Sequence, residues 1–461
     1  MAGIGFALRK LSQEKTFTAT FRAYIYAALA ASGPWILTIL TIGGLTVLTQ
    51  RVGQKEALYE FRILLVYNFS FSLVLASPLF IITTRYLADR LYLKDLKSAP
   101  GLIVGSLMAL YIFLLPFALI FYGMIAHLTL SARFNVIVNL MLISTLWLVS
   151  LFVSIIQDFR KVSWAYLIGG TIALIMAWGL LKILGEPGLM AGFNAGLAVT
   201  LGVLIAQIFT EYNYEFKFPT LFLSYVKRYR WLVLSAFMYN AGAWCDKWIM
   251  WFSSHSQHDP SGLRYFDNYD SAMFLSQLTI IPGMALFLLT VETGFFERCR
   301  TFYGDILNKV TYAQIEKNHK NLLENLLKSA RDTFILQGGI TALIIAIAPY
   351  FFMFFNFQYL QIGIFRLGTL GSCFQMIALF ILMLMTYFDA RREPVIISFV
   401  FLISNALFTS IFMRFGYQFY GYGYFLSALL TFCIATILLV RLVRNLPYQA
   451  FIRNNQSIQE I

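Results

Sequence analysis

The stretch Val136–Ile156, VIVNLMLISTLWLVSLFVSII, contains 21 residues and no charged side chain. A helix needs about 20 predominantly apolar residues to cross the roughly 30 Å of hydrocarbon in a bilayer. Similar runs recur along the whole chain. They occupy residues 22–49, 63–82, 101–125, 136–156, 164–184, 189–209, 230–252, 272–295, 334–354, 366–387, 394–413 and 424–443. We therefore predict an all-α polytopic membrane protein with about twelve transmembrane helices.

The composition excludes a soluble globular protein. Of the 461 residues 59% are hydrophobic and only 12% are charged, whereas soluble domains carry about 25% charged residues. The four cysteines include no Cys-x-x-Cys pair, which excludes a zinc ribbon or a disulfide framework.

The distribution of Lys and Arg predicts the orientation in the membrane. If the N-terminus is cytoplasmic, 26 of the 35 Lys and Arg residues fall in cytoplasmic segments and 8 in external loops, with Lys247 inside a span. Cytoplasmic loops carry such an excess, so we expect both termini in the cytoplasm. Residues 1–21 are polar and basic, and we expect no cleaved signal peptide. Nucleic acid is not expected as a partner, because the net charge of +13 is scattered over short segments.

Two long cytoplasmic loops, 210–229 and 296–333, suggest the domain organisation. Division at the first loop leaves six spans on each side. The expected parts are a cytoplasmic N-terminal segment (1–21), an N-terminal six-helix lobe (22–209), a cytoplasmic linker (210–229), a C-terminal six-helix lobe (230–443) and a cytoplasmic tail (444–461).

Each predicted half begins with a span that contains helix-breaking residues about 11 positions in. These are Ser32-Gly33-Pro34 in the first half and Asn240-Ala241-Gly242 in the second. Interrupted helices at matching positions of two halves point to a transport path. Alternatively, Gly33, Pro34 and Gly242 produce only packing kinks, since Gly and Pro are common in membrane helices.

The seventh span carries two ionisable residues, which are costly in hydrocarbon and usually functional or paired. Helical spacing places Asn240, Trp244 and Lys247 on one stripe, with Trp251 beyond them. Asp246 points about 100° away, with Tyr239, so we do not expect Asp246 and Lys247 simply to pair. The candidate substrate path is therefore Tyr239, Asn240, Trp244, Asp246 and Lys247. The alternative is that Lys247 snorkels to the outer interface among tryptophans of the aromatic belt.

Three charged residues at the cytoplasmic ends of spans are candidates for an entrance to that path. They are Arg85, Asp158 and Glu292, and interfacial anchoring is the alternative for each. In the external loop, His255, His258 and Asp259 have metal-like spacing but polar, Pro-containing surroundings, so we expect no metal site.

The segment 296–333 reads as an amphipathic helix, with Ile315, Leu322, Leu326 and Ala330 at helical spacing. It could lie on the inner leaflet, receive a partner protein, or be a solvated connector. The chain contains no nucleotide-binding glycine motif and no paired catalytic constellation. We therefore expect neither an enzyme nor a cofactor.

Several short motifs resemble one known family. They are Met1-Ala-Gly-Ile-Gly-Phe6 with Leu8-Arg-Lys-Leu11, Ser32-Gly-Pro-Trp35, Thr84-Arg-Tyr-Leu-Ala-Asp-Arg90, Asp246-Lys-Trp248 and Tyr387-Phe-Asp389. Together they resemble the PelG family, the inner-membrane transport proteins of Pel exopolysaccharide systems, within the multidrug/oligosaccharidyl-lipid/polysaccharide exporter superfamily.

The resemblance implies two six-helix lobes around a central cavity. It also implies export of a cationic, N-acetylgalactosamine-rich polymer for the biofilm matrix. The implied partners are a cytoplasmic UDP-sugar glycosyltransferase and two further inner-membrane proteins, one of which senses cyclic di-GMP. Two alternatives stay open: a cation-coupled flippase or antiporter of lipid-linked oligosaccharides or drugs, and a membrane scaffold that recruits the polymerase.

Overall fold

The computed structural model describes residues 17–50, 55–93, 99–153, 159–211, 222, 224–354 and 358–448. Apart from one short antiparallel hairpin, β1 (Gln257–His258) with β2 (Arg264–Tyr265), the regular structure of these residues is helical. Ten helical segments of the described chain are long and apolar enough to cross a membrane. The prediction of an all-α polytopic membrane protein is confirmed.

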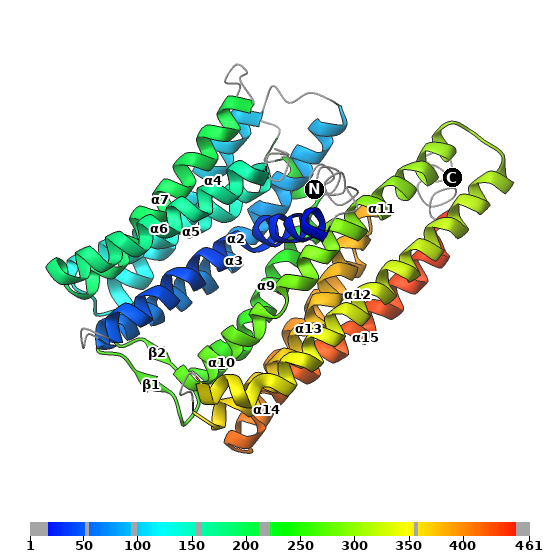
Figure 1. The fold of residues 1–461 in the computed structure, drawn as a ribbon. Coiled ribbons are helices and arrows are strands. Elements are labelled where there is room, and N and C mark those ends of the chain that lie inside the picture. Colours follow the sequence, from blue (N-terminus) through cyan, green and yellow to red (C-terminus); the bar gives the residue numbers. More distant parts are fainter. Residues whose placement is uncertain are drawn as a thin grey trace. The chain divides into compact units, whose positions relative to one another are not determined.

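The helices divide into two compact units (Figure 1). The first unit comprises Ile25–Phe266 and the second mainly Asp267–Ile461. By its contacts with α3, α9 belongs to the first unit, whereas counting spans places it at the start of the C-terminal lobe. The first unit contains α2 (Phe17–Gln50, from Ile25), α3 (Lys55–Tyr92), α4 (Ala99–Ile120), the π-helix η1 (Phe121–Ile125), α5 (Leu130–Val153), α6 (Phe159–Leu184), α7 (Glu186–Glu211), α8 (Ser224–Arg228) and α9 (Arg230–Met250).

Close helix packing holds the first unit together, most clearly between α6 and α7. Gly188, Gly192 and Gly196 follow one face of α7, and a Cβ at any of them would collide with the backbone of α6. Small residues at such spacing let membrane helices approach closely. Gly33 plays the same part in α2, where a Cβ would collide with the ring of Tyr166 on α6.

The second unit begins with a broken helix. It contains α10 (Asp267–Leu278), α11 (Ile281–Leu307), α12 (Tyr312–Phe354), α13 (Leu360–Tyr387), α14 (Glu393–Met413), the 3₁₀ turn η3 (Tyr417–Phe419), α15 (Tyr422–Arg444) and α16 (Leu446–Tyr448). The predicted span 272–295 is interrupted, because α10 ends at Leu278 and α11 starts at Ile281. Pro282 lies at the start of α11, where its missing N–H and its ring prevent a regular helix from continuing through.

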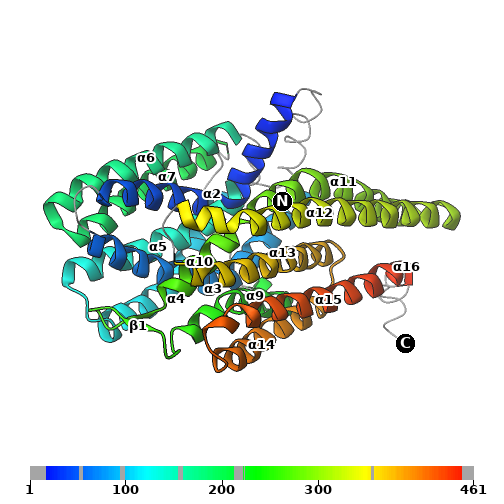
Figure 2. The same ribbon diagram turned by 60° about the horizontal axis from the view of Figure 1, so that its bottom comes forward.

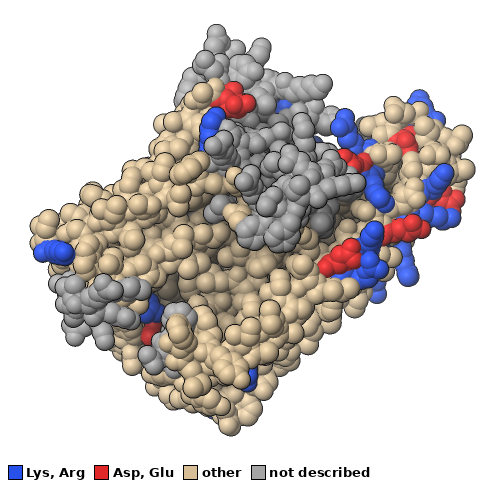
Figure 3. All heavy atoms as spheres, viewed as in Figure 1, with Lys and Arg blue, Asp and Glu red and all other residues tan. Residues whose placement is uncertain are grey.

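The amphipathic segment 296–333 is part of a long helical hairpin made by α11 and α12 (Figure 2). With 43 residues, α12 is about twice as long as a membrane crossing requires. Its charged N-terminal half therefore extends beyond the hydrocarbon. On the face shown in Figure 3, charged side chains gather over the far part of this hairpin.

The apolar stripe of this hairpin is covered by the chain itself. Ile315, Leu322 and Leu326 are at most 8% exposed, and His319 lies between them on the same buried face. Nε2 of His319 lies 3.0 Å from the carbonyl oxygen of Val443, near the end of α15. Ala330, the last residue of the predicted stripe, is exposed. Among the three interpretations, the packing fits a connector with its own tertiary contacts, since this apolar face is not free to enter a leaflet.

Candidate functional site

The seventh predicted span coincides with α9, and its two ionisable residues form a buried ion pair. Asp246 is 0% exposed and Lys247 2%. Nζ of Lys247 donates to Oδ1 and Oδ2 of Asp246 at 3.1 and 3.2 Å, and to the carbonyl oxygen of Ala243 at 3.2 Å. The expectation that these neighbours do not pair is wrong, because the lysine side chain is long enough to bend back across the helix surface. Snorkelling to an interface is excluded by the same burial.

The stripe around this ion pair is a packed surface. Trp244 and Trp251 are 6% and 4% exposed, and the Nζ of Lys247 lies 5.4 Å from the ring centre of Trp244. Trp251 stacks on Tyr67 of α3 at a centroid distance of 4.2 Å. Trp244, Asp246 and Lys247 thus lie together in a buried part of α9, and Trp251, directly after this helix, packs against α3.

The other polar residues of α9 differ in their surroundings. Tyr239 is buried. Asn240 is partly exposed, and its Nδ2 donates to the carbonyl oxygen of Ala236 at 2.9 Å. The indole nitrogen of Trp248 is buried and has no acceptor among the described residues, although the side chain as a whole is partly exposed. A buried N–H without a partner is rare and unfavourable.

Only one of the two predicted helix breaks appears in the backbone. In α2, Ser32 has non-helical angles (φ −135°, ψ 19°) directly before Gly33-Pro34. By contrast, α9 is one helix from Arg230 to Met250, across Gly242. Proline removes a backbone donor and clashes with the preceding turn, whereas glycine keeps its N–H. Gly242 alone therefore does not interrupt the backbone hydrogen bonds of α9.

The second unit has its break at the junction of α10 and α11, which hydropathy did not reveal. The freed carbonyl oxygen of Thr279 accepts a hydrogen bond from Nε2 of Gln337 on α12, at 2.9 Å. Gln337 is 0% exposed. The dipeptide Pro282-Gly283 was the available sequence signal. A broken membrane helix needs such a partner, because hydrocarbon offers none.

The entrance candidates are placed only in part. Arg85 is half-buried near the end of α3, and its guanidinium carbon lies 5.7 Å from the ring centre of Tyr229. Asp158 and the side chain of Glu292 lie outside the described residues. In the β1–β2 hairpin, Oδ2 of Asp259 accepts a hydrogen bond from the hydroxyl of Ser261 at 2.6 Å, so this carboxylate stabilises a turn.

A buried amide network ties three membrane helices of the first unit together. Nδ2 of Asn68 on α3 donates to Oδ1 of Asn139 on α5 at 2.8 Å, and Nδ2 of Asn139 donates to Oδ1 of Asn194 on α7 at 2.7 Å. The hydroxyl of Tyr122, on the π-helix η1, donates to Oδ1 of Asn68 at 2.6 Å. Each residue is at most 6% exposed. No sequence pattern indicates this network, because its members lie far apart along the chain.

The family assignment follows from comparison of the whole sequence. The family PelG, described as "Putative exopolysaccharide Exporter (EPS-E)", matches residues 1–451. The chain belongs to the PelG family. No curated protein matches the sequence. PelG membership makes the chain a membrane transporter of an exopolysaccharide export family and not an enzyme.

Solved structures support the same fold for this PelG chain. One is described as "Outward-facing conformation of a multidrug resistance MATE family transporter of the MOP superfamily", with TM-score 0.67, 14% identity, and coverage of 97% of this chain and 99% of that chain. Another is "Crystal structure of MATE in the bent conformation", with TM-score 0.63, 14% identity, and coverage of 98% and 99%. A third, a "MOP superfamily transporter from Pyrococcus furiosus Vc1 (DSM3638)", has TM-score 0.62, 14% identity, and coverage of 96% and 99%. These likenesses show a MATE-like fold of two lobes over nearly the whole chain.

Proposed function

We propose that this chain is the inner-membrane transporter that moves a cationic, N-acetylgalactosamine-rich exopolysaccharide of the Pel type from the cytoplasm to the periplasm, for the biofilm matrix. The PelG match over residues 1–451 carries this proposal. The polymer would arrive from a cytoplasmic UDP-sugar glycosyltransferase, and two further Pel inner-membrane proteins complete the proposed assembly.

The ion pair on α9 suits a transporter of a cationic polymer. A free lysine ammonium beside the path would repel positively charged sugars. Because Asp246 lies 3.1 Å from the ammonium of Lys247, the pair itself carries no net charge. The proposed path residues then have two roles: Asp246, Lys247, Trp244 and Tyr239 are buried and position α9, while the partly exposed Asn240 contacts the polymer.

Trp248 adds a donor to this proposed path. Its indole nitrogen has no acceptor among the described residues. The partly exposed ring of Trp248 can stack on an apolar sugar face, and its buried indole nitrogen could donate to a hydroxyl or acetamido oxygen once the polymer displaces the side chains that cover it. Neither interaction requires a charged side chain, as expected for a conduit that lets a polymer slide.

Secretion by complemented deletion strains tests the proposal. We would measure galactosamine-containing polysaccharide outside cells that express the wild type, Asp246→Asn, Lys247→Ala or the double variant, normalised to the amount of each protein in the membrane. A buried charge without its partner costs about 3–5 kcal/mol. We therefore expect each single variant to lower abundance, and the double variant to recover it.

Trp248→Phe separates binding from folding, because it removes the N–H and keeps an aromatic ring. We expect lower secretion at unchanged abundance, while Trp164→Phe, at a position 54% exposed on α6, leaves both unchanged. Equal secretion by the Trp248 variant would remove that side chain from the path. Normal secretion by the deletion strain would overturn the proposed function itself.

A further inference from the structure

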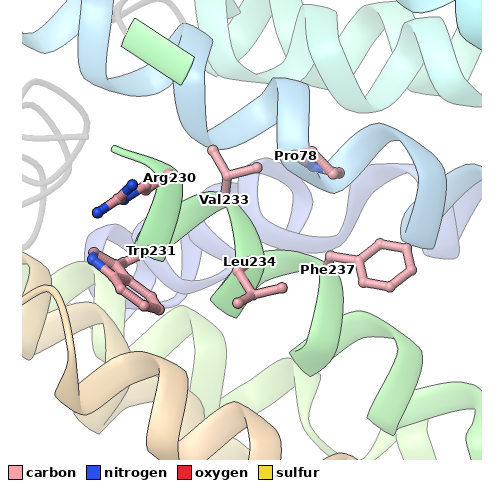
Figure 4. A pocket seen from close by; sticks show the side chains of 6 residues that line it. All are labelled: Pro78, Arg230, Trp231, Val233, Leu234 and Phe237. Carbon is pink, nitrogen blue, oxygen red and sulfur yellow. The ribbon is translucent and has the colours of Figure 1, made fainter. Parts of the chain in front are cut away.

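An apolar groove lies along α3 and α9 at the end of α9 that the charge bias predicts to be cytoplasmic. Its volume is about 560 Å³, within the range of roughly 300–1,000 Å³ typical of ligand sites. Pro78 of α3 lines it together with Arg230, Trp231, Val233, Leu234 and Phe237 of α9 (Figure 4). Five of these six residues are apolar, and Arg230 stands at the start of the helix.

The groove is accessible from outside the first unit. Trp231, Leu234 and Phe237 are 40%, 36% and 40% exposed, although each is a large apolar residue. They follow one another at intervals of three along α9, so they form one continuous strip. Such a strip in a membrane helix can receive an acyl chain along its length.

A cluster of cations adjoins the mouth of this groove. The guanidinium carbons of Arg85 and Arg228 lie 5.7 and 5.4 Å from the ring centre of the same residue, Tyr229. Arg230 follows directly in the sequence, 5.4 Å from the ring centre of Trp231. Contacts of this kind hold the side chains of Arg228 and Arg230 in place, and they leave the N–H groups of these two arginines able to bind oxygen atoms.

Negative charge near this cluster is scarce among the described residues. None of their carboxylates forms an ion pair with Arg228 or Arg230, and both side chains are exposed. The carboxylate of Asp89 is engaged by the hydroxyl of Tyr225, which donates to Oδ2 at 2.8 Å. Burial and this hydrogen bond raise the pKa of Tyr225 to about 12, so the hydroxyl keeps its proton and Asp89 keeps its partner at neutral pH.

We propose that this groove binds an anionic phospholipid of the membrane, with its phosphate at Arg228 and Arg230 and one acyl chain along Pro78, Val233, Leu234 and Phe237. Charge complementarity selects this occupant, because an apolar slot that ends in arginines matches an amphiphile with a phosphate headgroup. Basic pockets between membrane helices at the cytoplasmic side bind anionic lipid headgroups in this way. Trp231 lies between the phosphate end and the acyl-chain end of the proposed site. Indole rings are enriched at this level of a membrane, the interface between headgroups and hydrocarbon.

Lipid binding by the purified full-length chain tests this proposal. Phosphatidylglycerol would be titrated into mixed micelles with phosphatidylcholine, and the melting temperature and the lipid retained per chain would be recorded. Each arginine near an anionic lipid contributes about 1 kcal/mol, so Arg230→Ala should weaken phosphatidylglycerol binding about fivefold. The control Arg444→Ala changes an exposed arginine at the end of α15 and should bind as the wild type.

A second variant tests the acyl-chain part with the arginines intact. Leu234→Trp fills the groove and should also lower retention of phosphatidylglycerol. Leu407→Trp, at a leucine that is 55% exposed on α14, is its control and should leave retention unchanged. Both groove variants should melt as the wild type does in phosphatidylcholine alone, which shows that they are folded.

Three results would overturn the proposal. Equal stabilisation of the chain by phosphatidylcholine and phosphatidylglycerol would mean that no anion is recognised. A full thermal shift with inorganic phosphate alone would indicate a site for free anions. Retention unaffected by both groove variants would place the bound lipid elsewhere.

Discussion

The Asp246–Lys247 pair illustrates how a membrane helix tolerates two charges. An isolated charge in a span costs at least about 2.5–3.5 kcal/mol, but here each group is the nearest partner of the other, and the amide backbone of Ala243 takes a further hydrogen bond. The pair is neutral as a unit.

The asparagine network in the first unit is a second arrangement of polar groups in the membrane, made without charges. Replacing Asn139 by Leu removes the acceptor of Asn68 and the donor to Asn194. Because a buried polar group without a partner costs about 1–3 kcal/mol, we expect a lower melting temperature in detergent.

Asn135→Ala is the matched control for this prediction. Among the described residues, the Nδ2 of the partly exposed Asn135 donates to the carbonyl oxygen of Ser131 in its own helix. Its backbone oxygen, which accepts from Asn194 at 2.8 Å, survives the change. Equal melting temperatures for the two variants would mean that the network does not hold α3, α5 and α7 together.

At the scale of the element, the sequence identified helices better than it identified their interruptions. Long apolar runs dictate helix in a bilayer, because every backbone group must find a partner within its own segment. Hydropathy does not reveal the break at Thr279, because the apolar run continues through it, and Gly242 does not break α9, because a glycine keeps its backbone N–H.

The contacts of the candidate site were harder to predict than its helices. Position on a helical wheel assigned Asp246 and Lys247 to different faces, yet side-chain length brought them together. The partners of Asn68 and Thr279 lie on other helices, 71 and 58 residues away in the sequence. No periodicity encodes such pairs.

The break between α10 and α11 makes a specific prediction about Gln337. Replacing it by Leu leaves the carbonyl oxygen of Thr279 buried without its donor, at an expected cost of about 1–3 kcal/mol. The melting temperature should fall, and backbone amides around Ile280 should exchange hydrogen faster.

Gln314→Leu is a suitable control for that change, since it alters an exposed glutamine near the start of the same helix. If the Gln337 variant melts and exchanges like this control, the junction of α10 and α11 is stabilised by other contacts. In that case Gln337 would not be the residue that fixes the break.

At the scale of the whole molecule, the uneven distribution of cations connects the topology with both proposals. The predicted cytoplasmic segments contain 26 Lys and Arg residues and the predicted external loops contain 8. This bias predicts that the end of α9 with Arg230 and the charged half of the α11–α12 hairpin lie on the cytoplasmic side. The polymerase would approach this side. The anionic lipid groove would also open on this side.

Cysteine labelling measures this orientation directly. In a variant whose four natural cysteines are replaced, Ser254→Cys places a thiol in the external loop and Lys320→Cys places one on the hairpin; both positions are exposed. A membrane-impermeant maleimide should label Ser254→Cys in intact spheroplasts and Lys320→Cys only after permeabilisation. Labelling of both after permeabilisation shows that neither thiol is sterically hidden. The reverse pattern in intact spheroplasts would place Arg230 at the outer leaflet. The proposed direction of export would then be wrong, and the groove would bind a lipid of the outer leaflet.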